Sequence, residues 1–163
     1  MSTRSIKSAA GFTLVELLIA LAVMGILLAA VAVAFNASFT NYRENEDIFK
    51  SINKARQALN RITTQIRTAN RVYVIDETLE QCSMETPDGQ YIRYQYNDAN
   101  NALYMETNGN NYILCDNVTD MNFVKTKAVD NDFAKNVQIS ITVASGNIER
   151  TISAAAVIRR NLK

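Results

Sequence analysis

The chain of 163 residues contains no histidine and no tryptophan. Histidine is the usual general acid or base near neutral pH and the commonest metal ligand, so its absence argues against most acid–base enzymes and histidine-ligated metal sites. Basic residues number 17 and acidic residues 16, a net charge of +1. Nucleic-acid binding needs a basic face, so this balance argues against it. The sequence therefore predicts a protein that is not an enzyme, with no cofactor, bound metal or nucleic-acid partner.

Residues that interrupt helices are also scarce, because the chain has one proline, Pro87, and five glycines. From Phe12 to Asn70 only Gly25 is of either type. This stretch predicts one continuous helix of roughly 88 Å at 1.5 Å per residue. Its first part contains nineteen uncharged residues, from Leu17 to Phe35. They would span about 28 Å, close to the thickness of the hydrocarbon core of a bilayer.

An acid, Glu16, lies at the start of this apolar run. A carboxylate next to lipid is costly unless it has a partner, so it marks a candidate functional site. The run is longer than the apolar region of a secretory signal peptide, which has about 7–15 residues and ends at a small-residue cleavage site. The basic residues Arg4 and Lys7 precede the run, so the positive-inside rule places this end in the cytoplasm.

The segment Gly11-Phe12-Thr13-Leu14-Val15-Glu16, with its basic leader and apolar run, resembles the processing site of type IV pilins and pseudopilins. In that family a prepilin peptidase cuts after the glycine and methylates the new amino terminus. The resemblance implies cleavage after Gly11, methylation of Phe12 and a role for Glu16 in subunit assembly. It also implies other pilin or pseudopilin subunits, an inner-membrane assembly platform and membrane lipid as partners. One departure from many major pilins is Val33, where they carry a proline.

The second part of the helix is expected to be amphipathic. Apolar residues alternate spacings of four and three at Ile48, Ile52, Ala55, Leu59, Ile62, Ile66 and Ala69. This pattern predicts one buried stripe. We expect the stripe to pack on the chain's own β-sheet, with a homo-oligomeric coiled coil as the alternative.

Residues 71–163 are expected to form strands. Alternating or apolar segments separated by turn residues indicate strands at 72–75, 82–86, 91–96, 103–106, 112–115, 118–124, 137–143 and 148–158. The fold class is therefore α+β, with a long helix packed on an antiparallel sheet of about five to seven strands. The order of these pieces resembles W-type minor pilins and J-type minor pseudopilins of type II secretion. The predicted divisions are a leader at 1–11, a membrane or fibre-core helix at 12–36, an amphipathic helix at 37–70 and a head at 71–163.

The only two cysteines, Cys82 and Cys115, lie in the part expected to be exported. In an oxidising compartment they would form a disulfide, and we predict this bridge. Asp116, Asp120 and the run Asp130-Asn131-Asp132 offer oxygen ligands that would suit calcium. Their spacing is not that of an EF-hand, so we favour ordinary solvated loops.

Three functional classes fit these features. The first is a minor pilin-like subunit of a type IV pilus, anchored by one span in a bacterial inner membrane with its head in the periplasm before it enters the fibre. A minor pseudopilin of type II secretion is the alternative. A membrane-anchored periplasmic binding module that never enters a fibre is the most distant of the three.

Overall fold

The structure is a computed structural model, and it describes residues 11–74, 78–128 and 132–159. A single helix, α1, runs over Leu14–Thr68, close to the predicted range of 12–70. The chain divides into two compact units, 1–42 and 43–163. The last 26 residues of α1 therefore group with the strands rather than with the apolar run.

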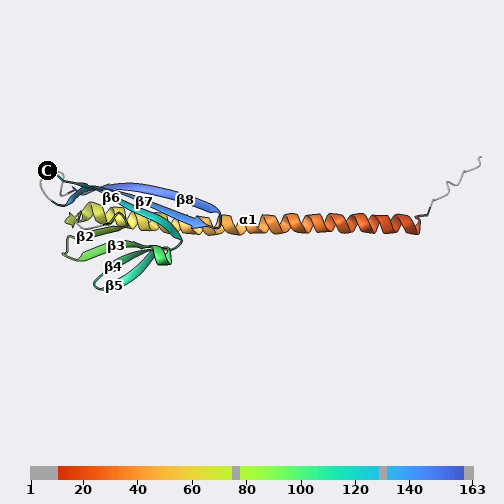
Figure 1. Cartoon of the computed structure of the whole chain (residues 1–163), viewed down its shortest axis with the longest axis horizontal. Helices are drawn as coiled ribbons and strands as arrows, with labels where there is room; N and C mark the ends of the chain where they lie inside the picture. The colour runs from red at the N-terminus through yellow and green to blue at the C-terminus, as the bar shows by residue number, and fades with distance from the viewer. Residues whose placement is uncertain (1–10, 75–77, 129–131, 160–163) are drawn as a thin grey trace, which may run out of the picture. The chain divides into compact units, whose positions relative to one another are not determined.

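Within the described residues, eight strands follow α1 and form two antiparallel sheets. The first sheet contains β1 (Arg71–Val72), β2 (Gln81–Glu85), β3 (Tyr91–Asn97), β4 (Ala102–Thr107) and β5 (Asn110–Cys115), in that spatial order. The second contains β6 (Val118–Lys127), β7 (Ala134–Ser145) and β8 (Ile148–Val157). A 3-10 turn, η1 (Asp98–Asn100), joins β3 to β4. Both sheets lie along the yellow, C-terminal part of α1 (Figure 1).

The predicted hairpins are confirmed, and turn residues explain their geometry. Between β4 and β5, Asn108 and Gly109 have φ values of 51° and 75°. Two consecutive positive φ angles match the right-handed twist of a hairpin, and Asn-Gly is the pair that adopts them most readily. Between β7 and β8, ten residue pairs follow in unbroken register from Ser145↔Ile148 to Asn136↔Val157.

The prediction of a single sheet is wrong, because the strands divide between β5 and β6. Asn117 lies at this junction with a left-handed φ of 56°. The next residue, Val118, donates its amide to the Asn101 carbonyl at 2.9 Å and pairs with Val143 of β7. The chain therefore leaves the first sheet without a proline or glycine to mark the turn.

The predicted apolar stripe of α1 packs against both sheets, as expected for a helix that covers its own head. Ile62 and Ile66 are fully buried, together with Tyr94 of β3 and Phe123 of β6. Burial raises the pKa of Tyr94 to about 12, and its hydroxyl donates to Gln65 on α1. The coiled-coil alternative is not needed to explain the stripe, since the chain itself covers it.

Candidate assembly site

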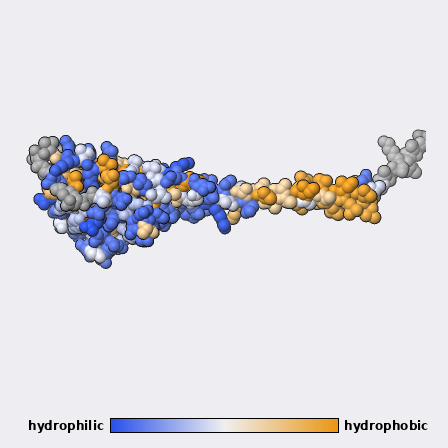
Figure 2. All heavy atoms as spheres, viewed as in Figure 1, coloured by the Kyte–Doolittle hydropathy of each residue, from blue (hydrophilic) through white to orange (hydrophobic). Residues whose placement is uncertain are grey.

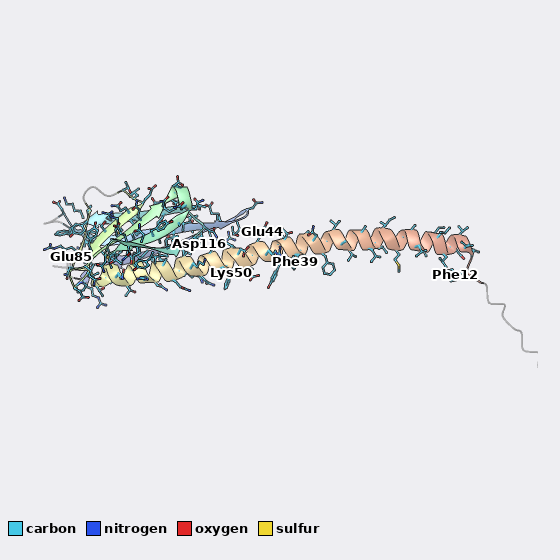
Figure 3. The ribbon with its side chains drawn as sticks, turned by 90° about the horizontal axis from the view of Figure 1, so that it is seen from below. Phe12, Phe39, Glu44, Lys50, Glu85 and Asp116 are labelled. Carbon is cyan, nitrogen blue, oxygen red and sulfur yellow. The ribbon has the colours of Figure 1, made fainter. Side chains whose placement is uncertain are left out.

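The residues predicted for processing lie at the start of α1. Gly11 and Phe12 precede the helix, and the Phe12 side chain is 85% exposed. Figure 3 places Phe12 at the N-terminal end of α1. The leader residues Arg4 and Lys7 lie outside the described residues. No described part of the chain covers the peptide bond after Gly11. A protease needs such access to the bond that it cleaves.

Glu16 and Thr13 form a reciprocal pair at the first turn of α1. The Thr13 amide donates to Glu16 Oε2 at 2.9 Å, and the Thr13 hydroxyl donates to the same oxygen at 3.0 Å. In return the Glu16 amide donates to Thr13 Oγ1 at 3.3 Å. This is a capping box, in which two side chains satisfy amides that a helix terminus leaves open.

The role of Thr13 was missed from the sequence, although its signal was present. Serine or threonine followed three residues later by glutamate, just before an apolar run, is the pattern of a capping box. The box gives Glu16 hydrogen-bond donors within its own chain. It therefore lowers the cost of placing a carboxylate at the head of an apolar helix.

The apolar run after Glu16 is uncovered over its whole length. The most apolar 18-residue window of α1 has a mean hydropathy of 2.9, and none of it is buried. Figure 2 shows this part of the helix as a continuous hydrophobic surface. By length and composition α1 can cross a membrane. The exposed leucines and isoleucines need lipid or other protein surface to cover them, because bare apolar surface of this extent is unfavourable in water.

The structure does not show the predicted Cys82–Cys115 disulfide, and both cysteine side chains are buried. Cys82 is in β2 and Cys115 is at the end of β5, with β3 and β4 between them. Three strand spacings correspond to about 14 Å, whereas the Cα atoms of a disulfide lie within about 7 Å. Counting cysteines does not reveal how many strands separate them.

This arrangement predicts two protected thiols. Without reductant, a maleimide should modify two cysteines per chain after denaturation and few before it. Burial raises the pKa of Cys115 to about 11, so at pH 8 this thiol is protonated and is a poor nucleophile. Mass spectrometry counts the labels. If the denatured protein accepts labels only after reduction, the two cysteines form a disulfide and the prediction of two thiols is wrong.

The acids considered for calcium have other partners. Asp116 Oδ2 forms an ion pair with Lys54 on α1 at 2.7 Å, and Asp120 accepts from Asn122 at 2.9 Å. Asp130 and Asn131 lie outside the described residues. Among the residues that are described, no group of three candidate metal ligands comes together.

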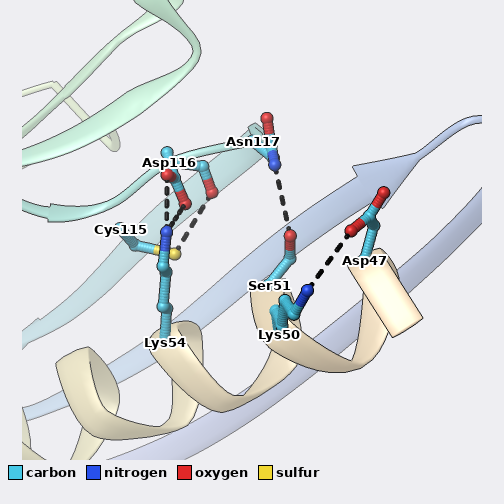
Figure 4. A network of polar contacts seen from close by, with 7 residues as sticks. All are labelled: Asp47, Lys50, Ser51, Lys54, Cys115, Asp116 and Asn117. Atoms are coloured by element: carbon cyan, nitrogen blue, oxygen red, sulfur yellow. Dashed lines mark hydrogen bonds and ion pairs between the residues drawn. The ribbon is translucent and has the colours of Figure 1, made fainter. Parts of the chain in front are cut away.

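The Lys54–Asp116 pair helps to fix the junction between the two sheets. Beside it, Asn117 donates to the Ser51 hydroxyl at 3.2 Å, as Figure 4 shows. Two side chains one turn apart on α1 thus hold the two residues that separate β5 from β6. The ion pair is half exposed and is worth about 0.2–1 kcal/mol, so it positions this junction more than it stabilises the fold.

Comparison with known proteins identifies the N-terminal segment. Residues 6–32 match the family model described as the prokaryotic N-terminal methylation motif. No curated protein and no solved structure matches the chain. The matched residues include the capping box and most of the uncovered apolar run. The motif implies a structural subunit that a prepilin peptidase processes and that has other pilins as partners. The chain thus carries the N-terminal signal of type IV pilins and pseudopilins, on a long apolar helix that anchors it in a membrane.

Proposed function

We propose that this protein is a minor pilin-like subunit that takes part in the assembly of a type IV pilus, at the priming or tip complex. The observation that carries the proposal is the methylation motif over residues 6–32, with Glu16 at the head of an uncovered apolar helix. Prepilin peptidase cleaves after Gly11 and methylates the Phe12 amine. The processed subunit waits in the inner membrane until it enters the fibre.

Glu16 carries the assembly step in this proposal. The apolar runs of neighbouring subunits cover each other in the fibre core, where an unpartnered carboxylate is unfavourable. Cleavage creates an amine at Phe12, four residues before Glu16. The amine of one subunit then forms an ion pair with Glu16 of its neighbour, which supplements the intrachain hydrogen bonds from Thr13.

The orientation follows from the basic leader. Arg4 and Lys7 hold the N-terminus in the cytoplasm, where the peptidase works. The β-rich head then lies in the periplasm, and we assign it to residues 71–163. The helical residues 37–70 support it, since their stripe packs under both sheets.

Two features favour a minor subunit. Val33 replaces the proline of many major pilins. The charge is also unequally divided, since residues 12–70 carry 6 basic and 4 acidic groups and residues 71–163 carry 9 and 12. Unequal charge patterns select unlike neighbours more than they add affinity.

The test is a count of copies in sheared, purified fibres. We expect far fewer copies of this protein than of the most abundant pilin, and fewer fibres when its gene is deleted. If it is the bulk subunit, the assignment as a minor subunit is wrong. If the deletion leaves pili unchanged but blocks protein secretion, the chain is a minor pseudopilin of type II secretion. An unprocessed protein absent from any fibre would make it a membrane-anchored binding module.

A further inference from the structure

We propose that the head carries a binding site for a neutral carbohydrate, on the solvent-facing side of the first sheet. The site is a surface concavity of about 300 Å³. Six residues line it, namely Gln95, Asn97, Asn100, Tyr104, Glu106 and Asn111. Five of the six carry an amide or a carboxylate, and the sixth is a tyrosine.

Strand register brings these residues together on one face. Gln95 of β3 lies opposite Tyr104 of β4, and Glu106 of β4 lies opposite Asn111 of β5. Neighbouring residues in the sequence, such as Tyr94 and Met105, point the other way and are buried in the core. The concavity therefore lies on the side of the sheet away from the core that contains α1.

Two contacts hold the central side chains in place. Asn100, from the 3-10 turn, donates to the Tyr104 hydroxyl at 3.2 Å. Arg93 donates to Glu106 Oε2 at 3.2 Å. The ring of Tyr104 and the carboxylate of Glu106 are thus oriented before any ligand arrives, which reduces the entropy lost on binding.

The remaining amides are open to a ligand. Within the part of the chain that the structure describes, the side chains of Gln95, Asn97 and Asn111 make no hydrogen bond to another protein group. Each amide offers both a carbonyl acceptor and two N–H donors. Sugar hydroxyls both donate and accept, so a set of amides matches them better than it matches a ligand that only accepts. The electron-rich face of an aromatic ring suits the C–H groups of a pyranose ring.

Charge narrows the ligand to neutral sugars. Glu106 is the one charged residue among the six that line the concavity, and no lysine or arginine is among them. The Glu106 carboxylate forms an ion pair with Arg93 at 3.2 Å, so the pair carries no net charge that would attract a sialylated or sulfated glycan. Glu106 can still accept hydrogen bonds from the hydroxyls of a neutral sugar.

The experiment uses the full-length chain in detergent, captured on beads through a C-terminal tag so that many copies act together. The beads are applied to an array of oligosaccharides that carry neutral, sialylated or sulfated termini. We expect binding to at least one neutral glycan. Tyr104→Ala and the double variant Asn97→Ala/Asn111→Ala should each reduce that signal by about tenfold or more, since both an aromatic contact and several hydrogen bonds are lost.

Tyr112→Ala is the matched control, because Tyr112 is an exposed tyrosine on β5 of the same sheet that does not line the concavity. It should bind as the wild type does. The double variant changes two surface side chains only, so it keeps the test valid if Tyr104→Ala fails to fold. Binding of no neutral glycan, preference for charged glycans, or equal binding by all variants would overturn the proposal. Membrane anchoring and fibre assembly should be normal in every variant, so this test is separate from that of the proposed function.

Discussion

Glu16→Ala should reduce incorporation of the protein into fibres by roughly a hundredfold, since an ion pair in an apolar core is lost. The precursor should still insert in the membrane, because removing a charge from an apolar helix eases insertion. Cleavage after Gly11 should also continue. Immunoblots of membranes and of sheared fibres, with equal loading of cells, measure the two pools separately.

The capping box offers a way to separate two roles of Glu16. Glu16→Gln keeps a side chain that accepts hydrogen bonds from Thr13 but removes the charge, so it should fail as Glu16→Ala does. Thr13→Ala removes the hydroxyl and keeps the charge, so it should weaken the first turn of α1 while largely preserving assembly. If Thr13→Ala and Glu16→Ala lose incorporation into fibres equally while Glu16→Gln assembles normally, then Glu16 acts only as part of the helix cap.

A second acid provides the matched control. Glu46 is also on α1, and its ion pair with Lys50 at 2.8 Å is exposed. The hydrogen bond and charge of Lys50 lower the pKa of Glu46, so the carboxylate is ionised at neutral pH. Glu46→Ala removes the same charge as Glu16→Ala but from a solvated surface, where such pairs contribute little. Its incorporation into fibres should therefore be close to that of the wild type.

The largest loss of stability is expected from the helix stripe. Ile62 is completely buried between α1 and the sheets, so Ile62→Ala removes apolar contacts and leaves a cavity. The free energy of unfolding of the head should fall by about 2–5 kcal/mol. Urea titration of the full chain in detergent, followed by tyrosine fluorescence, measures the change as a lower midpoint at an unchanged slope.

Thr64→Ala is the control for this variant, because Thr64 is two residues away and exposed. Its hydroxyl donates to the Asn60 carbonyl of the same helix. Surface substitutions of this kind usually change stability by less than about 0.5 kcal/mol. Equal midpoints for Ile62→Ala and Thr64→Ala would mean that the stripe does not pack under the sheets.

Local chemistry explains why much of the fold was predictable. The length of α1 follows from the absence of proline between Phe12 and Asn70, and its buried face follows from the spacing of Ile62 and Ile66. The β4–β5 turn follows from Asn108-Gly109. Each of these features depends on residues that are neighbours in the sequence, so each can be predicted from the sequence alone.

The features that were missed depend on contacts between distant residues. The separation into two sheets occurs at Asn117, which has a left-handed backbone and whose side chain donates to Ser51 on α1, 66 residues away. Asparagine tolerates this conformation without requiring it, so its presence alone predicts no break. The structure differs from the predicted disulfide for the same kind of reason, since the order of strands decides which cysteines lie close together. The candidate carbohydrate site likewise draws residues from three strands and a turn.

Processing at Gly11 is the central claim, and intact-mass analysis of the protein from a host with an active prepilin peptidase tests it most directly. We predict a chain that begins at Phe12, with one additional methyl group on its amine. A Gly11→Val variant should retain residues 1–11 and the mass of the precursor. A wild-type chain that still begins at Met1 in that host would contradict the account.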